Sequence, residues 1–367
     1  MPAVLKTLPV IYIVCLMLAV TVGTLSGQEK KGRSKPDRKA VTQKQDGRNR
    51  STGKSALPKD SALQQYGIYA KSAPVAGPAE AIETSLPLPL KNGDRVALIG
   101  NTLFDRAQHF GHFEALLHRH FPNLELVVRN LAWSADTVDL RPRPSNFANL
   151  DQHLTHEKVD VIIAAFGFNE SFAGEDGLAD FEKALASFLT SLKTKAYNGK
   201  SAPRVLLISP IANENVEAVN AADLNNEQIQ LYVDAMKNVA DQQNVGFVDA
   251  FEPLQQAMAS PGTDLTINGC HLNAKGYATF GVNLFSQAFG VSEAAAKKYL
   301  GNSESLLAAI TDRNRQFNRR YRPVNTFYYT GARNKSYGYL DFLPAMRNFD
   351  VMASNRDRRV WDVAQGK

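Results

Sequence analysis

The chain has 367 residues, of which 44% are hydrophobic and 21% charged, and this ordinary globular composition excludes a low-complexity or wholly disordered protein. Its net charge of +6 is carried by the two ends: residues 1–60 have eight excess positive charges, residues 311–367 have seven, and residues 61–310 have nine excess negative charges. An acidic middle argues against a core that binds duplex nucleic acid. The two cysteines, Cys15 and Cys270, are too few for a disulfide-stapled scaffold or a Cys-based metal cluster.

The first 27 residues have the organisation of an export signal. Lys6 precedes an uncharged apolar run from Leu8 to Val22, and a stretch of small residues follows where a signal peptidase would cut. The run is also near the lower length limit for a membrane-spanning helix, so a retained N-terminal anchor is the alternative to a cleaved signal peptide. In either case we expect an exported protein that is periplasmic, extracellular or tethered to a membrane.

Residues 28–90 are predicted to form a disordered basic linker. The part from Gln28 to Asp60 has almost no large apolar side chain and many Lys and Arg residues, so it cannot bury enough surface to offset the entropy of ordering. Residues 72–90 are rich in Ala and Pro and lead into the folded part. A solvated spacer is the simpler interpretation, and contact of this basic leader with an anionic envelope surface is the alternative.

Residues 91–291 are predicted to fold as one α/β domain. Short apolar, β-branched runs predict strands at Arg95–Ile99, Leu124–Arg129, Val159–Ala165, Val205–Ser209 and Val245–Asp249. Amphipathic stretches predict helices at Leu103–His120, Leu178–Ala196, Leu224–Gln243 and Lys275–Phe289. Buried strands that alternate with helices are typical of a parallel sheet covered on both faces, a three-layer αβα sandwich. Ligands of such sheets bind at the carboxyl ends of the strands.

Polar segments accompany these predicted elements at Gly100–Leu103, Asn130–Thr137, Gly167–Glu170 and Asn268–Asn273. Their order and spacing resemble the SGNH (GDSL) hydrolase family over roughly residues 93–290. The resemblance implies a flavodoxin-like sheet and ester hydrolysis by a hydroxyl nucleophile. It implies Thr102 as the nucleophile, His271 as the base and Asn268 as the residue that orients the base. The oxyanion hole would be formed by the backbone N–H groups of Thr102 and Ala132 and the side-chain amide of Asn169.

Four positions depart from the family's pattern. Thr102 stands in place of serine, Asn101 in place of an acid, Ala132 in place of glycine and Asn268 in place of aspartate. A threonine hydroxyl can still attack a carbonyl once a base takes its proton, although its methyl group crowds the approach. Asn268 is the most costly change. In serine proteases, an asparagine in place of the orienting acid lowers turnover about 10⁴-fold because it favours the wrong imidazole tautomer.

Two functions are compatible with this pattern. The first is a secreted esterase that hydrolyses acyl esters, such as acetyl groups on a carbohydrate, through a Thr102–His271 dyad and an oxyanion hole. The second is a protein of weakened catalysis whose pocket binds a carbohydrate or protein partner. Another carboxylate could also replace the missing acid, and the sequence does not choose among the candidates Asp264, Asp249 and Asp136.

Other kinds of site have less support. His109 and His112 lie three apart on a predicted helix, as zinc ligands can, but no cysteine or third ligand accompanies them, so no metal is predicted. Cys270 is interpreted as a small buried side chain that points away from its neighbour His271. Neither glycine-rich fingerprint of nucleotide-binding loops is present, and no cofactor is predicted.

Residues 292–367 are predicted to form a helical and basic C-terminal extension. Ser292–Ile310 has helical apolar spacing, and beyond it arginines alternate with aromatic residues. Arginines with interleaved aromatics can bind single-stranded nucleic acid or anionic sugars. An exported protein rarely meets nucleic acid, however, and the acidic middle offers an intramolecular partner. We therefore expect no nucleic-acid partner, and an arm that lies on the hydrolase-like domain.

Overall fold

The computed structural model describes residues 63–260, 262–323 and 339–367. The apolar run Leu8–Val22 and the basic stretch Gln28–Asp60 lie outside this part of the chain, so the export signal and the leader stay predictions. In the described ranges, no helix combines the length and the apolar character that crossing a membrane requires.

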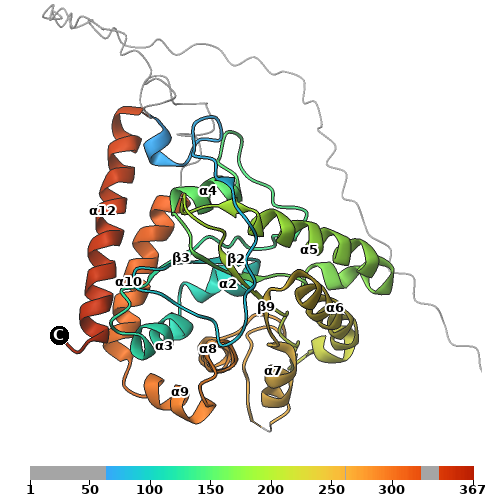
Figure 1. Cartoon of the computed structure of the whole chain (residues 1–367). Coiled ribbons are helices and arrows are strands. Elements are labelled where there is room, and N and C mark those ends of the chain that lie inside the picture. The colour runs from blue at the N-terminus through green and yellow to red at the C-terminus, as the bar shows by residue number, and fades with distance from the viewer. Residues whose placement is uncertain (1–62, 261, 324–338) are drawn as a thin grey trace, which may run out of the picture. The chain divides into compact units, whose positions relative to one another are not determined.

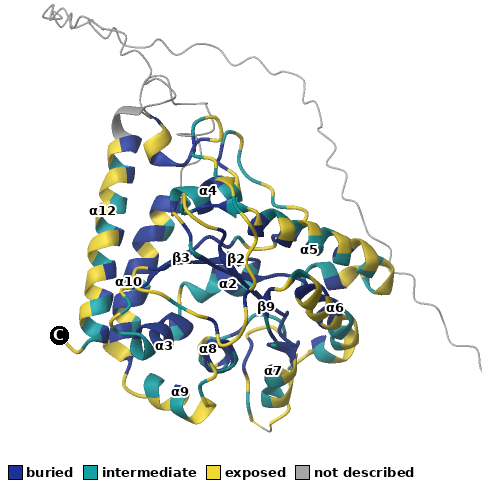
Figure 2. Cartoon of the chain, in the orientation of Figure 1, coloured by how far each residue is buried: buried dark blue, intermediate teal, exposed yellow. Residues whose placement is uncertain are grey.

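Five parallel strands form the central sheet (Figure 1). They are β2 (Arg95–Gly100), β3 (Val127–Asn130), β4 (Val161–Ala165), β6 (Arg204–Ile208) and β9 (Gly246–Val248). Their spatial order is β3-β2-β4-β6-β9, which is the 2-1-3-4-5 order of flavodoxin-like folds. Every residue of β3, β4 and β6 is buried, as Figure 2 shows for the centre of the domain. The predicted three-layer αβα sandwich with a parallel sheet is confirmed.

Helices cover both faces of this sheet. The α-helices are α2 (Thr102–Ala107), α3 (His112–His120), α4 (Leu150–His156), α5 (Leu178–Lys193), α6 (Ala221–Gln243), α7 (Phe251–Met258), α8 (Ala274–Phe289), α9 (Glu293–Leu300), α10 (Glu304–Tyr321) and α12 (Tyr339–Ala364). Successive side chains of β2 enter opposite layers: Ala97 and Ile99 pack with α4, α5 and α6, whereas Val96 and Leu98 pack with α3, α7 and α8. This alternation explains why the strands are apolar throughout.

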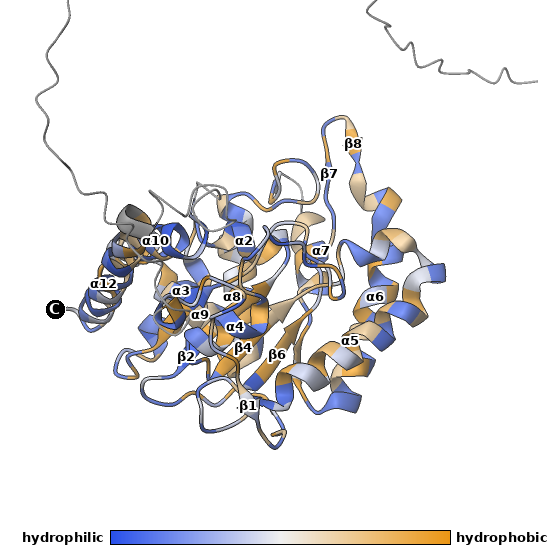
Figure 3. Ribbon diagram, turned by 90° about the horizontal axis from the view of Figure 1, so that it is seen from above, coloured by the Kyte–Doolittle hydropathy of each residue, from blue (hydrophilic) through white to orange (hydrophobic). Residues whose placement is uncertain are grey.

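Short elements complete the fold. They are the 3-10 helices η1 (Gln64–Tyr66), η2 (Glu170–Ala173) and η3 (Glu175–Gly177), and the strands β1 (Gly77–Pro78), β5 (Lys195–Ala196), β7 (Asn215–Val216) and β8 (Val219–Asn220). β1 pairs with β5, and β7 pairs with β8 in a hairpin that projects beyond the sheet in Figure 3. The same view shows apolar residues concentrated on the strands of the central sheet.

The helix predicted over Leu103–His120 is in fact two helices. α2 ends at Ala107 and α3 begins at His112, with Gly111 between them at a φ of +69°. A Cβ at Gly111 would lie 2.9 Å from the Ile310 side chain of α10. The break therefore gives the C-terminal arm room to pack against the domain, a long-range contact that helical periodicity alone does not reveal.

The predicted linker extends too far, because residues 63–90 are packed on the domain. Leu63, Ile68 and Tyr69 belong to the same apolar cluster as α4 and α5. Gln152 of α4 donates to the carbonyl oxygen of Ala70 at 2.8 Å, and β1 adds a pairing with β5. The apolar side chains of Leu63, Ile68 and Tyr69 bury enough surface to offset the entropy that this segment loses on ordering.

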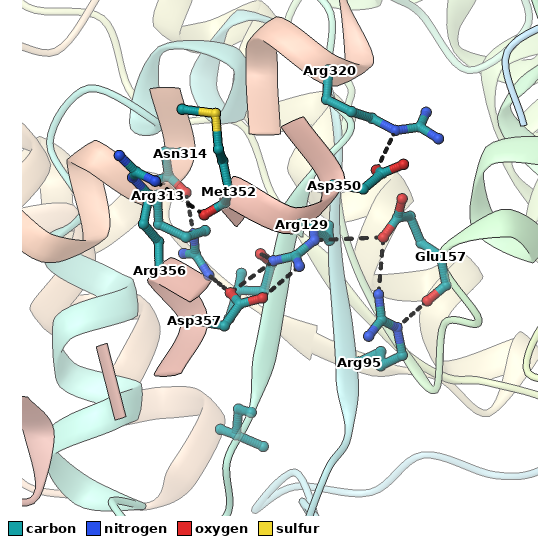
Figure 4. Close-up of polar contacts among 12 residues, drawn as sticks. Arg95, Arg129, Glu157, Arg313, Asn314, Arg320, Asp350, Met352, Arg356 and Asp357 are labelled. Carbon is teal, nitrogen blue, oxygen red and sulfur yellow. Dashed lines mark hydrogen bonds and ion pairs between the residues drawn. The ribbon is translucent and has the colours of Figure 1, made fainter. Parts of the chain in front are cut away.

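The C-terminal arm, α10 and α12, lies along the outer edge of the sheet, beside the edge strand β3, as Figure 1 shows. Buried ion pairs join it to the domain (Figure 4). Arg129 of β3 pairs with Asp357 of α12 at 2.6 Å, and Asp357 also accepts from Arg313 of α10 at 3.2 Å. Arg313 in turn pairs with Glu114 of α3. The arm thus lies on the domain, as expected from the charge distribution, and it covers a sheet edge that would otherwise be open.

Candidate active site

Thr102 lies where β2 passes into α2. Gly100 makes this turn possible, because a Cβ on it would lie 2.0 Å from the carbonyl oxygen of Ala165, and its φ is +129°. Asn101 caps α2 by accepting a hydrogen bond from the backbone N–H two residues further on, at 3.1 Å. The Thr102 hydroxyl oxygen accepts a hydrogen bond from the N–H of Ala135, 3.2 Å away.

Ala132, predicted as an oxyanion donor, does not line the cavity beside Thr102, and Ala135 lies there instead. Ala132 is buried, and its N–H donates to the side-chain oxygen of Asn130 at 3.1 Å, so it is not available to a substrate. Ala135 lines the cavity beside Thr102 and directs its N–H toward the hydroxyl. Its φ of +64° is in the left-handed region that glycine adopts most easily. The glycine-like position of this loop is therefore residue 135.

Asn169 follows the carboxyl end of β4, as predicted, and lines the same cavity. Its Nδ2 donates to the carbonyl oxygen of Asp136 at 3.3 Å, which leaves the second N–H of the amide for a ligand. The neighbouring Glu170 accepts hydrogen bonds from the N–H groups of Gly167 at 3.0 Å and Val138 at 2.9 Å. Glu170 thereby ties the loop after β4 to the loop that carries Ala135.

His271 is held by Asn268, and the contact determines which ring nitrogen carries the proton. The Asn268 side-chain oxygen accepts the backbone N–H of His271 at 3.0 Å. Because a backbone N–H can only donate, the amide oxygen and not the amide nitrogen must face His271. The same oxygen lies 3.0 Å from Nδ1 of the ring and can accept a proton carried there, which favours the tautomer that leaves Nε2 free to act as a base. In this orientation Asn268 does not impose the wrong tautomer that the sequence led us to expect.

The surroundings of His271 favour its neutral form. Burial lowers the pKa of His271 below its usual value of 6.5, and the positive charge of Arg106 lowers it further. Arg106 also donates to the carbonyl oxygen of Leu272 at 3.3 Å and so holds the loop that carries the histidine. Within the ranges that the structure describes, no ion pair or hydrogen bond links His271 to any of the three candidate acids, Asp264, Asp249 and Asp136.

Cys270 does not point away from its neighbour as predicted. Its Sγ lies 3.1 Å from Nδ1 of His271, and both residues line the cavity. Burial raises the pKa of the Cys270 thiol, which favours the neutral thiol over the nucleophilic thiolate. The contact with Nδ1, rather than with the base nitrogen Nε2, also argues against a cysteine nucleophile.

One cavity of about 230 Å³ brings most of the predicted residues together. It is lined by Thr102, Asn169 and His271, and also by Ala135, Phe168, Ser209, Ile211, Cys270 and Tyr277. Along the described chain, no hydrogen bond joins the Thr102 hydroxyl to the His271 ring, and the hydroxyl, which only accepts from Ala135, keeps its own hydrogen to donate. Catalytic hydrogen bonds are often long before a substrate is bound, so this arrangement is compatible with a Thr–His dyad.

Two histidines of the helices, His118 and His153, are buried. His118 and His153 are each 2% exposed, and burial lowers the pKa of each to about 3. His112, which could have joined His109 in a zinc site, also has its pKa lowered by burial. In the residues that the structure describes, no three His, Cys, Asp or Glu side chains are grouped to hold a metal ion.

Residues 97–279 match the model of the GDSL-like Lipase/Acylhydrolase family, as the polar segments predicted. Among solved structures, a protein described as a GDSL-like lipase from Parabacteroides merdae is 16% identical, with 56% of this chain and 99% of that chain covered and a TM-score of 0.45. An acetylxylan esterase from Geobacillus stearothermophilus, solved as a catalytic mutant, is 19% identical, with 56% and 97% covered and a TM-score of 0.45. No curated protein matches the chain.

Proposed function

The chain belongs, through residues 97–279, to the GDSL-like lipase/acylhydrolase family, and we propose that it hydrolyses acyl esters with Thr102 as nucleophile and His271 as general base. The observation that carries the proposal is the shared cavity, where a hydroxyl, an imidazole and two oxyanion donors, Ala135 and Asn169, meet at the carboxyl edge of the sheet. Acyl transfer needs this combination of groups.

In the proposed reaction, Nε2 of His271 takes the proton of the Thr102 hydroxyl as its oxygen attacks the ester carbonyl carbon. The negative charge that develops on the carbonyl oxygen is stabilised by the N–H groups of Thr102 and Ala135 and by Nδ2 of Asn169. The intermediate then releases the alcohol, which receives the proton from His271. A water molecule, deprotonated by His271, attacks the acyl carbon, and the bond from that carbon to the Thr102 oxygen breaks. His271 returns the proton to the Thr102 oxygen as the carboxylic acid leaves.

Two hollows support a substrate in which a short acyl group is esterified to a larger alcohol, such as an acetylated carbohydrate. The cavity at Thr102, of about 230 Å³, is suited to a short acyl chain. A second hollow of about 450 Å³ is mainly polar: the amides of Asn225 and Gln228 and the carboxylates of Glu175 and Asp176 lie beside the apolar Phe172 and Leu224. The ring of Phe172 contacts that of Phe168 at 5.5 Å, and Phe168 lines the first cavity, so the two hollows adjoin.

Hydrolysis of p-nitrophenyl acetate and of acetylated xylo-oligosaccharides tests the proposal. Thr102→Ala should lower kcat/KM about 10³-fold or more, because the nucleophile is lost. Thr102→Ser should retain or increase activity, because it keeps the hydroxyl and removes the crowding methyl group. The exposed Thr190→Ala is the matched control and should behave as the parent. Hydrolysis that survives Thr102→Ala unchanged would reject the assignment.

A binding protein of weakened catalysis is the second candidate function. Two observations favour it: no hydrogen bond joins the Thr102 hydroxyl to His271 in the described ranges, and an amide stands where an acid usually orients the base. Isothermal titration with deacetylated xylo-oligosaccharides separates the two functions. Binding that persists in His271→Ala, together with no ester hydrolysis by the parent protein, would favour the binding function.

The proposal includes export, because the apolar run from Leu8 to Val22 has the character of a signal peptide or an anchor. N-terminal sequencing of the mature protein from fractionated cells checks this. A protein that stays in the cytoplasm with an intact N-terminus would contradict it.

A further inference from the structure

The end of helix α10, within the C-terminal arm, contacts the loop that carries Ala135. We call residues 131–136 the oxyanion loop. Tyr321, the last residue of α10, donates its hydroxyl to the carbonyl oxygen of Leu131 at 3.1 Å. The same hydroxyl accepts the indole N–H of Trp133 at 2.8 Å. Tyr321 is 2% exposed, so these two hydrogen bonds lie away from water, where a missing partner would be costly.

Arg322 makes a second link between the arm and this loop. Its guanidinium lies 4.1 Å from the centre of the Trp133 ring and pairs with the Asp105 carboxylate at 2.7 Å. The other oxygen of Asp105 accepts the backbone N–H of Ser134 at 3.2 Å and also its hydroxyl. Arg322 therefore holds Ser134, the residue immediately before Ala135, through the carboxylate of Asp105.

The loop needs these contacts because its conformation is unfavourable for alanine. Ala135 has a φ of +64°, in the left-handed region where the Cβ of an alanine crowds the following carbonyl oxygen. Such a conformation persists only where the surrounding structure imposes it. The far side of the loop is also held, since Arg143 pairs with Asp136 at 2.6 Å.

We propose that Tyr321 and Arg322 are positioning residues that hold the oxyanion loop so that the Ala135 N–H faces the reacting oxygen. The arm is then part of the catalytic apparatus, although neither residue touches the cavity around Thr102. The proposal rests on the ester hydrolysis proposed above. This role explains why the arm, which buried ion pairs join to β3, also places the end of α10 against the loop that follows that strand.

The test uses the full-length protein with Arg322→Gln, Tyr321→Phe and the control Arg319→Gln. Arg319 is an exposed arginine of the same helix, and its replacement makes the same change in charge. With p-nitrophenyl acetate, Arg322→Gln and Tyr321→Phe should lower kcat about tenfold and leave KM within about twofold, because a displaced oxyanion donor affects the transition state most. Arg319→Gln should match the parent, and Arg322→Lys, which keeps the charge near Asp105, should recover part of kcat.

Hydrogen exchange of the backbone amides of residues 131–136 gives a readout that does not depend on activity. In Arg322→Gln the amides of Ser134 and Ala135 should exchange at least about tenfold faster than in Arg319→Gln, at an unchanged Tm. Unchanged exchange at these amides would overturn the proposal whether or not the protein is an esterase. Faster exchange with an unchanged kcat would overturn its catalytic part. An inactive parent protein would instead count against the proposed function.

Discussion

Asn268 keeps the proton on the correct nitrogen of His271 but brings no negative charge to the ring. The backbone N–H of His271 fixes the orientation of the amide, so the tautomer that a general base needs is preserved. The imidazolium that forms during catalysis lacks the usual carboxylate, and Arg106 disfavours it further. We therefore expect a slow esterase whose base stays neutral, and active, at lower pH than a histidine of ordinary pKa would.

The variant Asn268→Asp tests this interpretation. The added carboxylate should stabilise the imidazolium and raise kcat by at least about tenfold. It should also raise the pKa of His271, so the acidic limb of the pH profile of kcat/KM should move to higher pH, because protonation removes the base. Steady-state rates with p-nitrophenyl acetate between pH 4 and pH 9 provide both readouts. An unchanged rate and profile would contradict the role given to Asn268.

At the scale of elements, the arm and the edge strand β3 are joined by charges that are almost fully buried. Arg313 is 0% exposed and lies between the carboxylates of Glu114 and Asp357, while Asp357 also pairs with Arg129 (Figure 4). Burial alone would raise the pKa of Asp357, but the two arginines outweigh it and hold that pKa below its usual value. Removing one member of such a cluster leaves an uncompensated buried charge.

Asp357→Ala should therefore lower the free energy of unfolding by about 3–5 kcal/mol. Asp362→Ala, at an exposed position on the same helix, is the control and should change it by less than about 0.5 kcal/mol. Urea denaturation followed by circular dichroism measures both. Equal stability of the two variants would mean that the buried cluster does not hold the arm on the domain.

At the scale of the whole molecule, the basic C-terminal arm and the acidic middle of the chain form ion pairs with each other. The basic arm places Arg313 and Arg322 on carboxylates of the acidic middle, Glu114 and Asp105. The same packing buries two histidines as neutral groups, His118 near the ion cluster and His153 among Phe147 and Tyr321. The folded state therefore binds fewer protons than the unfolded chain between pH 3 and pH 6.5.

The two buried histidines should make the protein less stable at acidic pH. The unfolded histidines take up protons below pH 6.5 while the folded ones stay neutral, so stability is present above that pH and is lost as the pH falls. As the pH falls from 6.5 to 5, each buried histidine should lower the free energy of unfolding by about 2 kcal/mol. His153→Phe should reduce the loss of Tm over this range, and His109→Asn, at an exposed position, should not. Identical pH slopes for the parent and His153→Phe would contradict this explanation.

The sequence by itself determined the sheet and the edge at which the site lies. Apolar runs that alternate with amphipathic stretches allow few arrangements other than a covered parallel sheet, and Thr102, Asn169 and His271 follow from polar segments near its elements. Local pattern suffices for these features because each strand and each turn is specified by its own few residues.

Only the tertiary structure revealed that Ala135, and not the predicted Ala132, lies beside Thr102, and it alone placed the amide oxygen of Asn268 against Nδ1 of His271. The two alanines are alike in a sequence, and they differ in φ and in the partner of each N–H. The N–H of Ala132 bonds to the nearby Asn130, whereas that of Ala135 meets Thr102 of another element. Chemistry at this site depends on the direction of single N–H bonds, and contacts between residues remote in the chain set that direction.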